Sequence, residues 1–429
     1  MIAPMTANAQ AILLLTAPLI AGRADPSPSL LSLGEYNRLT RVLREKQKQP
    51  ADLIGPESSD LVGFCAAVFD RPRLKNLLGR GFLLSQAVDH WNARGIWVVS
   101  RADATYPRRI KARLREDAPP VLYGCGDAAL LETGGLAVVG SRHVDDELIS
   151  YTENIGRLSA NAHRTVISGG AKGIDRAAMH GALQAGGAAA GVMADSLERA
   201  ALARDNREAL VDQRLVFISP YDPAAGFNVG HAMQRNKVIY ALADAAFVVT
   251  SDFEKGGTWA GAIEQLERLH FVPVFVRNGA NAGKGNAALL QRGARLWPDL
   301  HEGHELAEAL AAAAAAAASE PKQVTLSFVV REEHSNEAKG RDSAAVPANS
   351  PATSADTAPR PAQQLLKTVR DILVRELVEA HSETEVATML AVPKPQAKAW
   401  LTQLVDEGVL EKLSKPVRYR RATTLERLL

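Results

Sequence analysis

Small and basic residues recur in short turns in the middle of the sequence, and their types suit the binding of phosphate groups. The first turn is Gly140–His143 (sequence GSRH), and the second is Ser168–Gly173 (sequence SGGAKG). Glycine lets the backbone approach an anion closely, and the N-terminus of a helix offers amide groups with a favourable dipole. Because glycine also makes tight turns for purely structural reasons, one such turn alone would not indicate a ligand.

Further turns of the same kind follow along the chain. Arg235, Asn236 and Lys237 stand near the start of an expected helix, and Lys255–Thr258 (sequence KGGT) opens another. Gly283–Asn286 repeats the pattern more weakly. A single mononucleotide would not need so many anion-binding turns, so the pattern favours a chain of phosphates.

Residues able to break or form covalent bonds are poorly represented. The sequence contains neither the GxSxG turn of a serine nucleophile nor the GxxxxGK[ST] phosphate loop. We interpret Asp175 and His180 as structural residues of one helix, and Glu264 has no evident partner for acid–base work. Cys65 and Cys125 lack metal-binding spacing. We therefore expect no enzymatic activity, no metal and no cofactor.

Alternating strands and helices must position these turns. Nearly all-apolar runs predict strands, separated by amphipathic segments that predict helices, as in a parallel sheet covered on both faces. Ligands bind such sheets at the carboxyl ends of the strands, where these turns lie. The sequence thus predicts an α/β, Rossmann-like, doubly wound core. The expected strands are Leu136–Val139, Thr165–Ser168, Ala189–Met193, Leu215–Ser219, Ala246–Thr250 and Pro273–Val276; the expected helices include Leu148–Ala160, Ile174–Ala185, Ala232–Ala243 and Trp259–Leu269.

We divide the chain into four parts. Residues 1–124 form a mainly helical region with one short strand at Ile96–Val99, and residues 125–300 form the core. Residues 301–362 form an alanine-rich helix and a linker that is too polar to bury a core. Residues 363–429 are expected to form a winged helix-turn-helix. The apolar run Ala11–Ala21 is interpreted as a buried first helix, because a signal peptide would need preceding basic residues.

The winged-helix prediction rests on three helices followed by a hairpin. A helix over Leu365–Ala380 precedes a second helix capped by Ser382, a third covers Gln396–Glu407, and Val409–Leu413 pairs with Val417–Arg420. Its basic residues could contact a DNA backbone, although winged helices also bind proteins, and the sequence leaves both open. These basic residues are Lys394, Lys398, Lys412, Lys415, Arg418 and Arg420.

Composition limits the alternatives. The 429 residues contain 50 Lys and Arg against 48 Asp and Glu, so any basic surface must be local. No apolar run reaches the roughly 20 residues that a membrane-spanning helix needs. We expect a cytoplasmic protein that does not bind membranes.

Taken together and in this order, the motifs resemble the DprA/Smf family of DNA-processing proteins. The resemblance runs through the following motifs: Ala137–Arg142, Ser168–Asp175, His180–Leu183, Arg235–Ile239, Gly256–Thr258, Asn286–Leu290 and Gly293–Ala294. It implies a homodimeric, non-enzymatic protein that binds single-stranded DNA and helps to load the RecA recombinase during natural transformation. Arg142, Lys172, Arg235 and Lys237 would then contact phosphates. The nucleic-acid-binding residues implied are Gly140, Ser141, Arg142, Ser168, Gly169, Gly170, Lys172, Arg235, Asn236, Lys237, Gly256, Gly257 and Thr258.

A second hypothesis is a nucleotide-binding enzyme or sensor on the same fold. Gly256–Thr258 faintly resembles the glycine-rich turn of phosphoribohydrolases, which pair that turn with a glutamate. Here the glutamate is displaced to Glu264. Release of a base from a nucleoside monophosphate would distinguish this hypothesis from strand binding.

Overall fold

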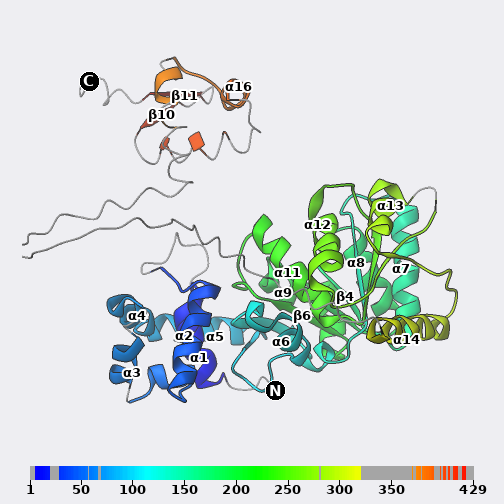
Figure 1. The fold of residues 1–429 in the computed structure, drawn as a ribbon, viewed down its shortest axis with the longest axis horizontal. Helices are drawn as coiled ribbons and strands as arrows, with labels where there is room; N and C mark the ends of the chain where they lie inside the picture. Colours follow the sequence, from blue (N-terminus) through cyan, green and yellow to red (C-terminus); the bar gives the residue numbers. More distant parts are fainter. Residues whose placement is uncertain are drawn as a thin grey trace, which may run out of the picture. The chain divides into compact units, whose positions relative to one another are not determined.

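The computed structural model consists of two compact units, residues 1–327 and 328–429, which we describe separately. Figure 1 shows the N-terminal unit as a helical bundle joined to an α/β core. The structure describes residues 5–19, 29–56, 58–65, 69–279, 282–319, 370, 373–377, 379–390, 397, 400–401, 404–405, 409–413 and 418–421.

Five helices form the N-terminal bundle. The helix α1 is almost fully buried, since Ile12, Leu13 and Leu15 have no exposed surface, which confirms the predicted buried first helix. Ser32 and Glu35 form a capping box that fixes the start of α2. The helices are α1 (Ala7–Thr16), α2 (Leu33–Glu45), α3 (Ser58–Cys65), α4 (Arg71–Leu78) and α5 (Gly81–Asn92), with a 3-10 turn at Pro50–Ile54.

A nine-stranded sheet forms the centre of the core, in the order β1-β2-β6-β5-β4-β3-β7-β8-β9. The strands from β6 to β9 in this order pair in parallel, which confirms the predicted Rossmann-like fold and its six strands. The strands are β1 (Trp97–Ser100), β2 (Val121–Gly126), β3 (Leu136–Gly140), β4 (Val166–Ser168), β5 (Ala189–Val192), β6 (Leu215–Ser219), β7 (Ala245–Thr250), β8 (Val274–Val276) and β9 (Arg295–Leu296).

The sheet begins further upstream than the sequence predicted. Strand β2 pairs antiparallel with both β1 and β6, so the boundary placed between residues 124 and 125 falls inside β2. The short predicted strand Ile96–Val99 corresponds to β1, which is part of this sheet rather than of the helical region. The α/β core therefore starts at Trp97, because β1 pairs with β2 and β2 pairs in turn with β6 of the parallel sheet.

Helices cover both faces of the sheet (Figure 1). One apolar cluster joins Val138 to α7, α8, α10 and α14, and the other joins Ala137 and Val139 to α6, α11, α12 and α13. Alternate residues of β3 thus face opposite sides, as the pleat requires. The bounds are α6 (Arg108–Leu114), α7 (Asp146–Asn161), α8 (Ile174–Gln184), α9 (Leu197–Leu202), α10 (Arg204–Val211), α11 (Val229–Leu242), α12 (Gly256–Glu264), α13 (Gly283–Gln291) and α14 (Gly303–Ser319), with 3-10 turns η2 (Arg115–Asp117) and η3 (Ala128–Leu131).

These bounds confirm the four predicted core helices, and α14 confirms the predicted alanine-rich helix. The predicted helix Trp259–Leu269 is α-helical only to Glu264, after which Gln265–Leu269 forms a single π-helical turn. The part of the linker predicted over residues 320–362 lies outside the described residues. Within the part of the chain that the structure describes, no helix is long and apolar enough to cross a membrane.

The C-terminal unit contains the predicted capped helix and hairpin. Ser382 caps α16 (Glu383–Met389), and β10 (Leu410–Leu413) pairs antiparallel with β11 (Arg418–Arg421). Buried Leu373, Val386, Leu401 and Tyr419 join the helical segments to the hairpin in one apolar cluster, as in a winged helix.

The basic residues of this unit are only partly described. Arg418 donates a hydrogen bond to the carbonyl of Ala380 at 3.1 Å, and Arg420 forms an ion pair with Glu411 on the neighbouring strand. These contacts engage both guanidinium groups locally. Lys394, Lys398 and Lys415 lie outside the described residues, as does the side chain of Lys412.

Candidate nucleic-acid interface

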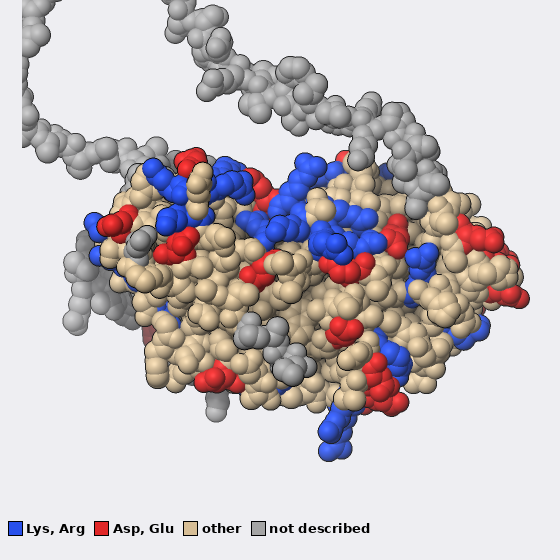
Figure 2. Space-filling model, turned by 90° about the horizontal axis from the view of Figure 1, so that it is seen from below, with Lys and Arg blue, Asp and Glu red and all other residues tan. Residues whose placement is uncertain are grey.

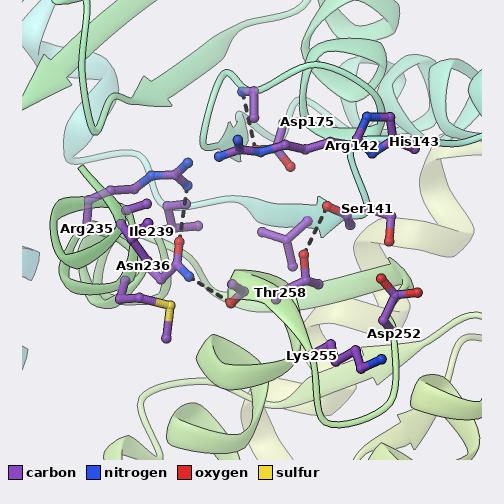
Figure 3. A pocket seen from close by; sticks show the side chains of 18 of the residues that line it. Ser141, Arg142, His143, Asp175, Arg235, Asn236, Ile239, Asp252, Lys255 and Thr258 are labelled. Carbon is purple, nitrogen blue, oxygen red and sulfur yellow. Dashed lines mark hydrogen bonds between the residues drawn. The ribbon is translucent and has the colours of Figure 1, made fainter. Parts of the chain in front are cut away.

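A pocket of about 350 Å³ lies at the carboxyl end of β3, between the start of α11 and the start of α12. Figure 3 shows side chains from these separate elements pointing into it. The sheet topology therefore brings together turns that are more than one hundred residues apart in sequence. The predicted site residues that line the pocket are Gly140, Ser141, Arg142, Arg235, Asn236, Gly256, Gly257 and Thr258.

The turns of the pocket are tied to one another by side-chain hydrogen bonds. Thr258 Oγ1 donates to the carbonyl of Gly140 at 3.0 Å, and Asn236 Nδ2 donates to the carbonyl of Gly257 at 3.0 Å. A Cβ atom at Gly140 would lie 2.5 Å from Ile174 Cγ1, so this position requires glycine. Asn236 and Thr258 thus hold the pocket walls in place, and a ligand would meet a preformed site.

Arg235 is the most buried cation of the pocket, with 6% of its surface exposed. Its Nη1 donates to Asn236 Oδ1 at 3.2 Å, whereas its buried Nε has no hydrogen-bond partner among the described residues. Burial lowers the pKa of this guanidinium, while the nearby Asp175 carboxylate raises it. Since arginine remains charged in proteins, the pocket contains a fixed positive charge whose buried Nε is an unused donor among the described residues.

Asp175 lies on the pocket wall and is equally buried. The amide of Ala171 donates to its Oδ2 at 3.4 Å. Burial raises the pKa of Asp175, and the positive charges of Arg235 and Arg142 oppose that rise. We therefore assign Asp175 a positioning role, in which it partly compensates the buried charge of Arg235.

The mouth of the pocket combines exposed cations with apolar side chains. Arg142 is exposed, and its guanidinium carbon lies 5.2 Å from the centre of the Phe227 ring. Phe227 is 58% exposed, and Lys255 and Met233 also line the pocket. Lys255 belongs to a turn that the sequence singled out, but sequence reasoning missed Phe227 and Met233. Phe227 belongs to an irregular segment without a motif, so no sequence signal could have placed it here.

A second hollow adjoins the first across the turn after β3. Its volume is about 730 Å³, and it shares Ser141, Arg142, His143 and Asp252 with the first pocket. Arg142 therefore stands between two concave surfaces, where its exposed charge is accessible from either side.

Several predicted residues do not line the pocket. Buried Ser168 donates from Oγ to the carbonyl of Val138 at 2.6 Å, and Lys172 is exposed on the turn before α8. Gly169 and Gly170 also lie outside the lining. However, a Cβ atom at Gly169 would lie 1.8 Å from Arg235 Nη1, so Gly169 provides the space that the buried guanidinium occupies.

The position of Lys237 differs from the predicted phosphate contact. Its side chain is 12% exposed, and its Nζ lies 3.4 Å from Glu264 Oε1. Residues two apart on a helix point to nearly opposite sides, so Lys237 cannot share the direction of Arg235. Its charge is engaged in an ion pair outside the pocket lining, which corrects the grouping of these two cations.

Comparison with known proteins places this core in a family. Residues 97–308 match the family model of DNA recombination-mediator protein A. Through this core the chain belongs to the DprA family. The match begins at the first residue of β1, which supports placing the start of the core at Trp97.

Individual DprA proteins are moderately similar in sequence. The DNA processing protein DprA of Streptococcus pneumoniae is 29% identical over 183 residues, which cover 42% of this chain and 64% of that protein. The DNA processing protein DprA of Bacillus subtilis is 26% identical over 223 residues, which cover 50% of this chain and 72% of that protein. The chain thus spans less than two thirds of the length of the S. pneumoniae relative.

A solved DprA structure shares the fold. The crystal structure of S. pneumoniae DprA has a TM-score of 0.52 and 20% identity, covering 71% of this chain and 98% of that one. The structure of Helicobacter pylori DprA, reported for its single-stranded DNA binding mode, has a TM-score of 0.41 and 22% identity. The match covers 51% of this chain and 96% of that one.

Proposed function

We propose that this DprA-family chain binds single-stranded DNA in the pocket after β3, through the sugar-phosphate backbone. The observation that carries the proposal is the arrangement of three cations around one preformed pocket, with Arg142 and Lys255 exposed at its mouth and Arg235 buried in its wall. Guanidinium groups match phosphate geometry, and their binding to nucleic acid releases counterions.

The apolar side chains at the mouth favour a single strand over a duplex. Phe227 and Met233 lie beside Arg142 and Arg235 in the same pocket lining. The bases of a single strand expose faces that can stack on an aromatic ring, whereas a duplex covers those faces. An aromatic ring next to phosphate-binding cations is therefore suited to an unpaired strand.

We propose that binding does not involve bond cleavage. Glu264, the candidate acid–base residue of the nucleotide-hydrolase hypothesis, forms ion pairs with Lys237 and with Arg268 at 3.1 Å. It does not line the pocket, while the buried Asp175 lies near Arg235. Incubation with nucleoside monophosphates should release no free base, and release of a base would contradict this part of the proposal.

The biological role follows from the family as a further proposal. We infer that the chain acts in the cytoplasm as a recombination mediator, protecting single strands and loading RecA during DNA uptake, and that it works as a homodimer. Membership of the DNA recombination-mediator protein A family supports this role. Sedimentation at several concentrations and RecA-filament assays on protected DNA test these two parts separately.

Fluorescence anisotropy with labelled oligothymidine tests the proposed DNA binding. Arg142→Ala should weaken binding and make its salt dependence less steep, by roughly 0.7 in the log–log slope for each lost phosphate contact. Arg207→Ala, an exposed arginine on α10, provides a matched control that should retain wild-type affinity.

Lys237→Ala distinguishes the position seen in the structure from the sequence-based prediction. Since Lys237 forms an ion pair with Glu264, its removal should change DNA affinity much less than removal of Arg142. If Arg142→Ala bound DNA like the wild type, or if the wild type bound no single strand, the proposed function would be wrong.

A further inference from the structure

A second group of cations lies outside the pocket, where the N-terminal bundle meets the sheet. Arg38, Arg41 and Arg44 are exposed and follow each other at three-residue spacing on α2. Side chains at this spacing are neighbours on a helix surface and form one ridge. Arg101, directly after β1, lies against the same helix, with its guanidinium carbon 5.0 Å from the centre of the Tyr36 ring. We call these four arginines the N-terminal basic surface.

Hydrogen bonds join this surface to the core. Arg101 donates to Asn37 Oδ1 on α2 at 2.5 Å and to the carbonyl of Glu116 at 2.9 Å. Arg41 forms an ion pair with the Glu116 carboxylate at 2.6 Å. Because α2, the end of β1 and the turn η2 contact one another in this way, the arginines have a fixed position relative to the sheet.

The surface carries more positive charge than its contacts neutralise. Among the described residues, Arg41 alone of the four arginines forms an ion pair with a carboxylate. Arg41, Arg101 and Arg44 together lower the pKa of Glu116, which shows that several guanidinium charges act on one carboxylate. The guanidinium of Arg38 lies 5.9 Å from the Phe69 ring, a contact that leaves its charge uncompensated.

This surface and the pocket lie at the same edge of the sheet. Ser100, the last residue of β1, pairs with Val121, and Tyr123 pairs with Ser219, the last residue of β6. The end of β1 therefore lies at the edge formed by the carboxyl ends of the parallel strands. Five strand spacings of about 4.8 Å separate β1 from β3, which places the surface roughly 24 Å from the pocket along this edge.

Figure 2 shows Lys and Arg side chains gathered over the N-terminal bundle and the adjoining core on the face seen from below. Asp and Glu side chains are interspersed among them, and fewer cations lie over the rest of this face. The helix α2, which carries three of the four arginines, is part of the N-terminal bundle, and the turn η2, which carries Glu116, follows α6 in the adjoining core.

We propose that the N-terminal basic surface contacts the phosphate backbone of the same strand that occupies the pocket. This inference rests on the proposed function, because it needs a strand bound at β3. A strand leaving the pocket along the sheet edge would reach the α2 ridge, where exposed arginines offer paired donors to phosphate. The surface extends the DNA-binding site beyond the pocket, so affinity depends on strand length.

The test compares two variants on oligothymidines of different length. Arg38→Ala combined with Arg44→Ala removes two charges and retains the Arg41–Glu116 and Arg101–Asn37 contacts. Arg204→Ala combined with Arg207→Ala removes two exposed arginines from α10, which packs on the sheet face opposite α6. Thermal unfolding followed by circular dichroism shows that each variant is folded before its affinity is measured.

We expect the α2 variant to bind short oligonucleotides of about 5 residues like the wild type, because these fill only the pocket. For strands of about 30 residues its salt slope should be less steep by up to about 1.4, as expected for two lost single-strand phosphate contacts. The α10 variant should match the wild type at both lengths.

The inference would be overturned if the α2 variant and the wild type bound long strands with equal affinity and equal salt slope. That outcome is expected if the N-terminal basic surface instead binds an acidic protein. Arg142→Ala serves as the internal reference. If it weakens binding at both lengths while the α2 variant has no effect, the pocket proposal stands and only the extension fails. If Arg142→Ala has no effect at either length, the proposed function fails first.

Discussion

Replacement of Gly169 by alanine should weaken DNA binding while the core remains folded. The added Cβ atom would lie 1.8 Å from Arg235 Nη1 and 2.3 Å from Arg235 Cζ, far inside any non-bonded contact distance. The backbone at Gly169 is outside the left-handed region, so alanine itself is compatible with its conformation. The guanidinium of Arg235 must therefore move.

The magnitude follows from the burial of Arg235. Arg235 is packed in the pocket wall with 6% of its surface exposed. Forcing such a buried side chain aside should lower the free energy of unfolding by about 1–3 kcal/mol. A hydrogen bond from a charged donor contributes about 1.5–3 kcal/mol. If the displaced guanidinium no longer reaches the bound phosphate, affinity for single-stranded DNA should fall by roughly 10- to 150-fold.

A double-mutant cycle isolates this effect. Urea unfolding and DNA affinity are measured for Gly169→Ala, Arg235→Met and the combination of both. Methionine lacks the Nη and Cζ atoms that would collide with the new methyl group. Gly169→Ala should therefore reduce the free energy of unfolding and the DNA affinity much less in the Arg235→Met background. The expected coupling energy is about 0.5–3 kcal/mol.

Gly34→Ala on α2 is a suitable control, since a Cβ atom there meets no atom within 4 Å. It should change neither stability nor affinity appreciably. The reasoning would be refuted if Gly169→Ala lowered the free energy of unfolding equally in both backgrounds, or if the Gly169→Ala variant bound DNA with wild-type affinity.

Two further predictions concern the N-terminal bundle. Arg80 donates hydrogen bonds to the carbonyl of Ala17 at 3.0 Å and to the carbonyl of Leu14, both at the end of α1. Arg80→Ala should therefore lower the free energy of unfolding, measured with urea, by about 1–3 kcal/mol. Lys75→Ala, at an exposed position of α4, is the control and should leave it unchanged. Hydrogen bonds from Arg73 lower the pKa of Glu35 to about 2, so its carboxylate stabilises the fold above its ordinary pKa of 4.5, and this contribution is lost as pH falls through 2. Glu35→Gln should make stability less dependent on pH between 4.5 and 2, and an unchanged acid-unfolding curve would contradict this.

The parallel part of the sheet could be predicted because its strands are buried on both faces. Such strands appear in the sequence as short, continuous apolar runs separated by helical patterns. Strand β2 lacks this signal because its sequence, VLYGCG, contains two glycines that weaken an isolated strand. Gly124 is required there because a Cβ atom would lie 2.4 Å from the Trp97 ring on β1, a contact between strands that the sequence does not show.

The site could be predicted as far as its turns. Parallel strands bring their carboxyl ends to one edge, so the sequence located the glycine-rich turns of β3 and α12 correctly relative to each other. It grouped Arg235 with Lys237 because they are close in sequence, although helix geometry separates their directions by about 200°. That correction was available from periodicity alone, whereas the position of Phe227 depends on the irregular segment before α11.

The burial of Arg235 and the exposure of Arg142 imply different contributions to binding. Arg235 is already ordered by Asn236 and by the charge of Asp175, so a phosphate that reaches its unused Nε does not have to immobilise a long side chain. Arg142 lies at the mouth, where salt screens its charge and where the centre of the Phe227 ring lies 5.2 Å from its guanidinium carbon. Capture of the strand should therefore depend on Arg142 and on ionic strength, whereas the fit of the bound phosphate should depend on Arg235 and on the absence of a side chain at Gly169.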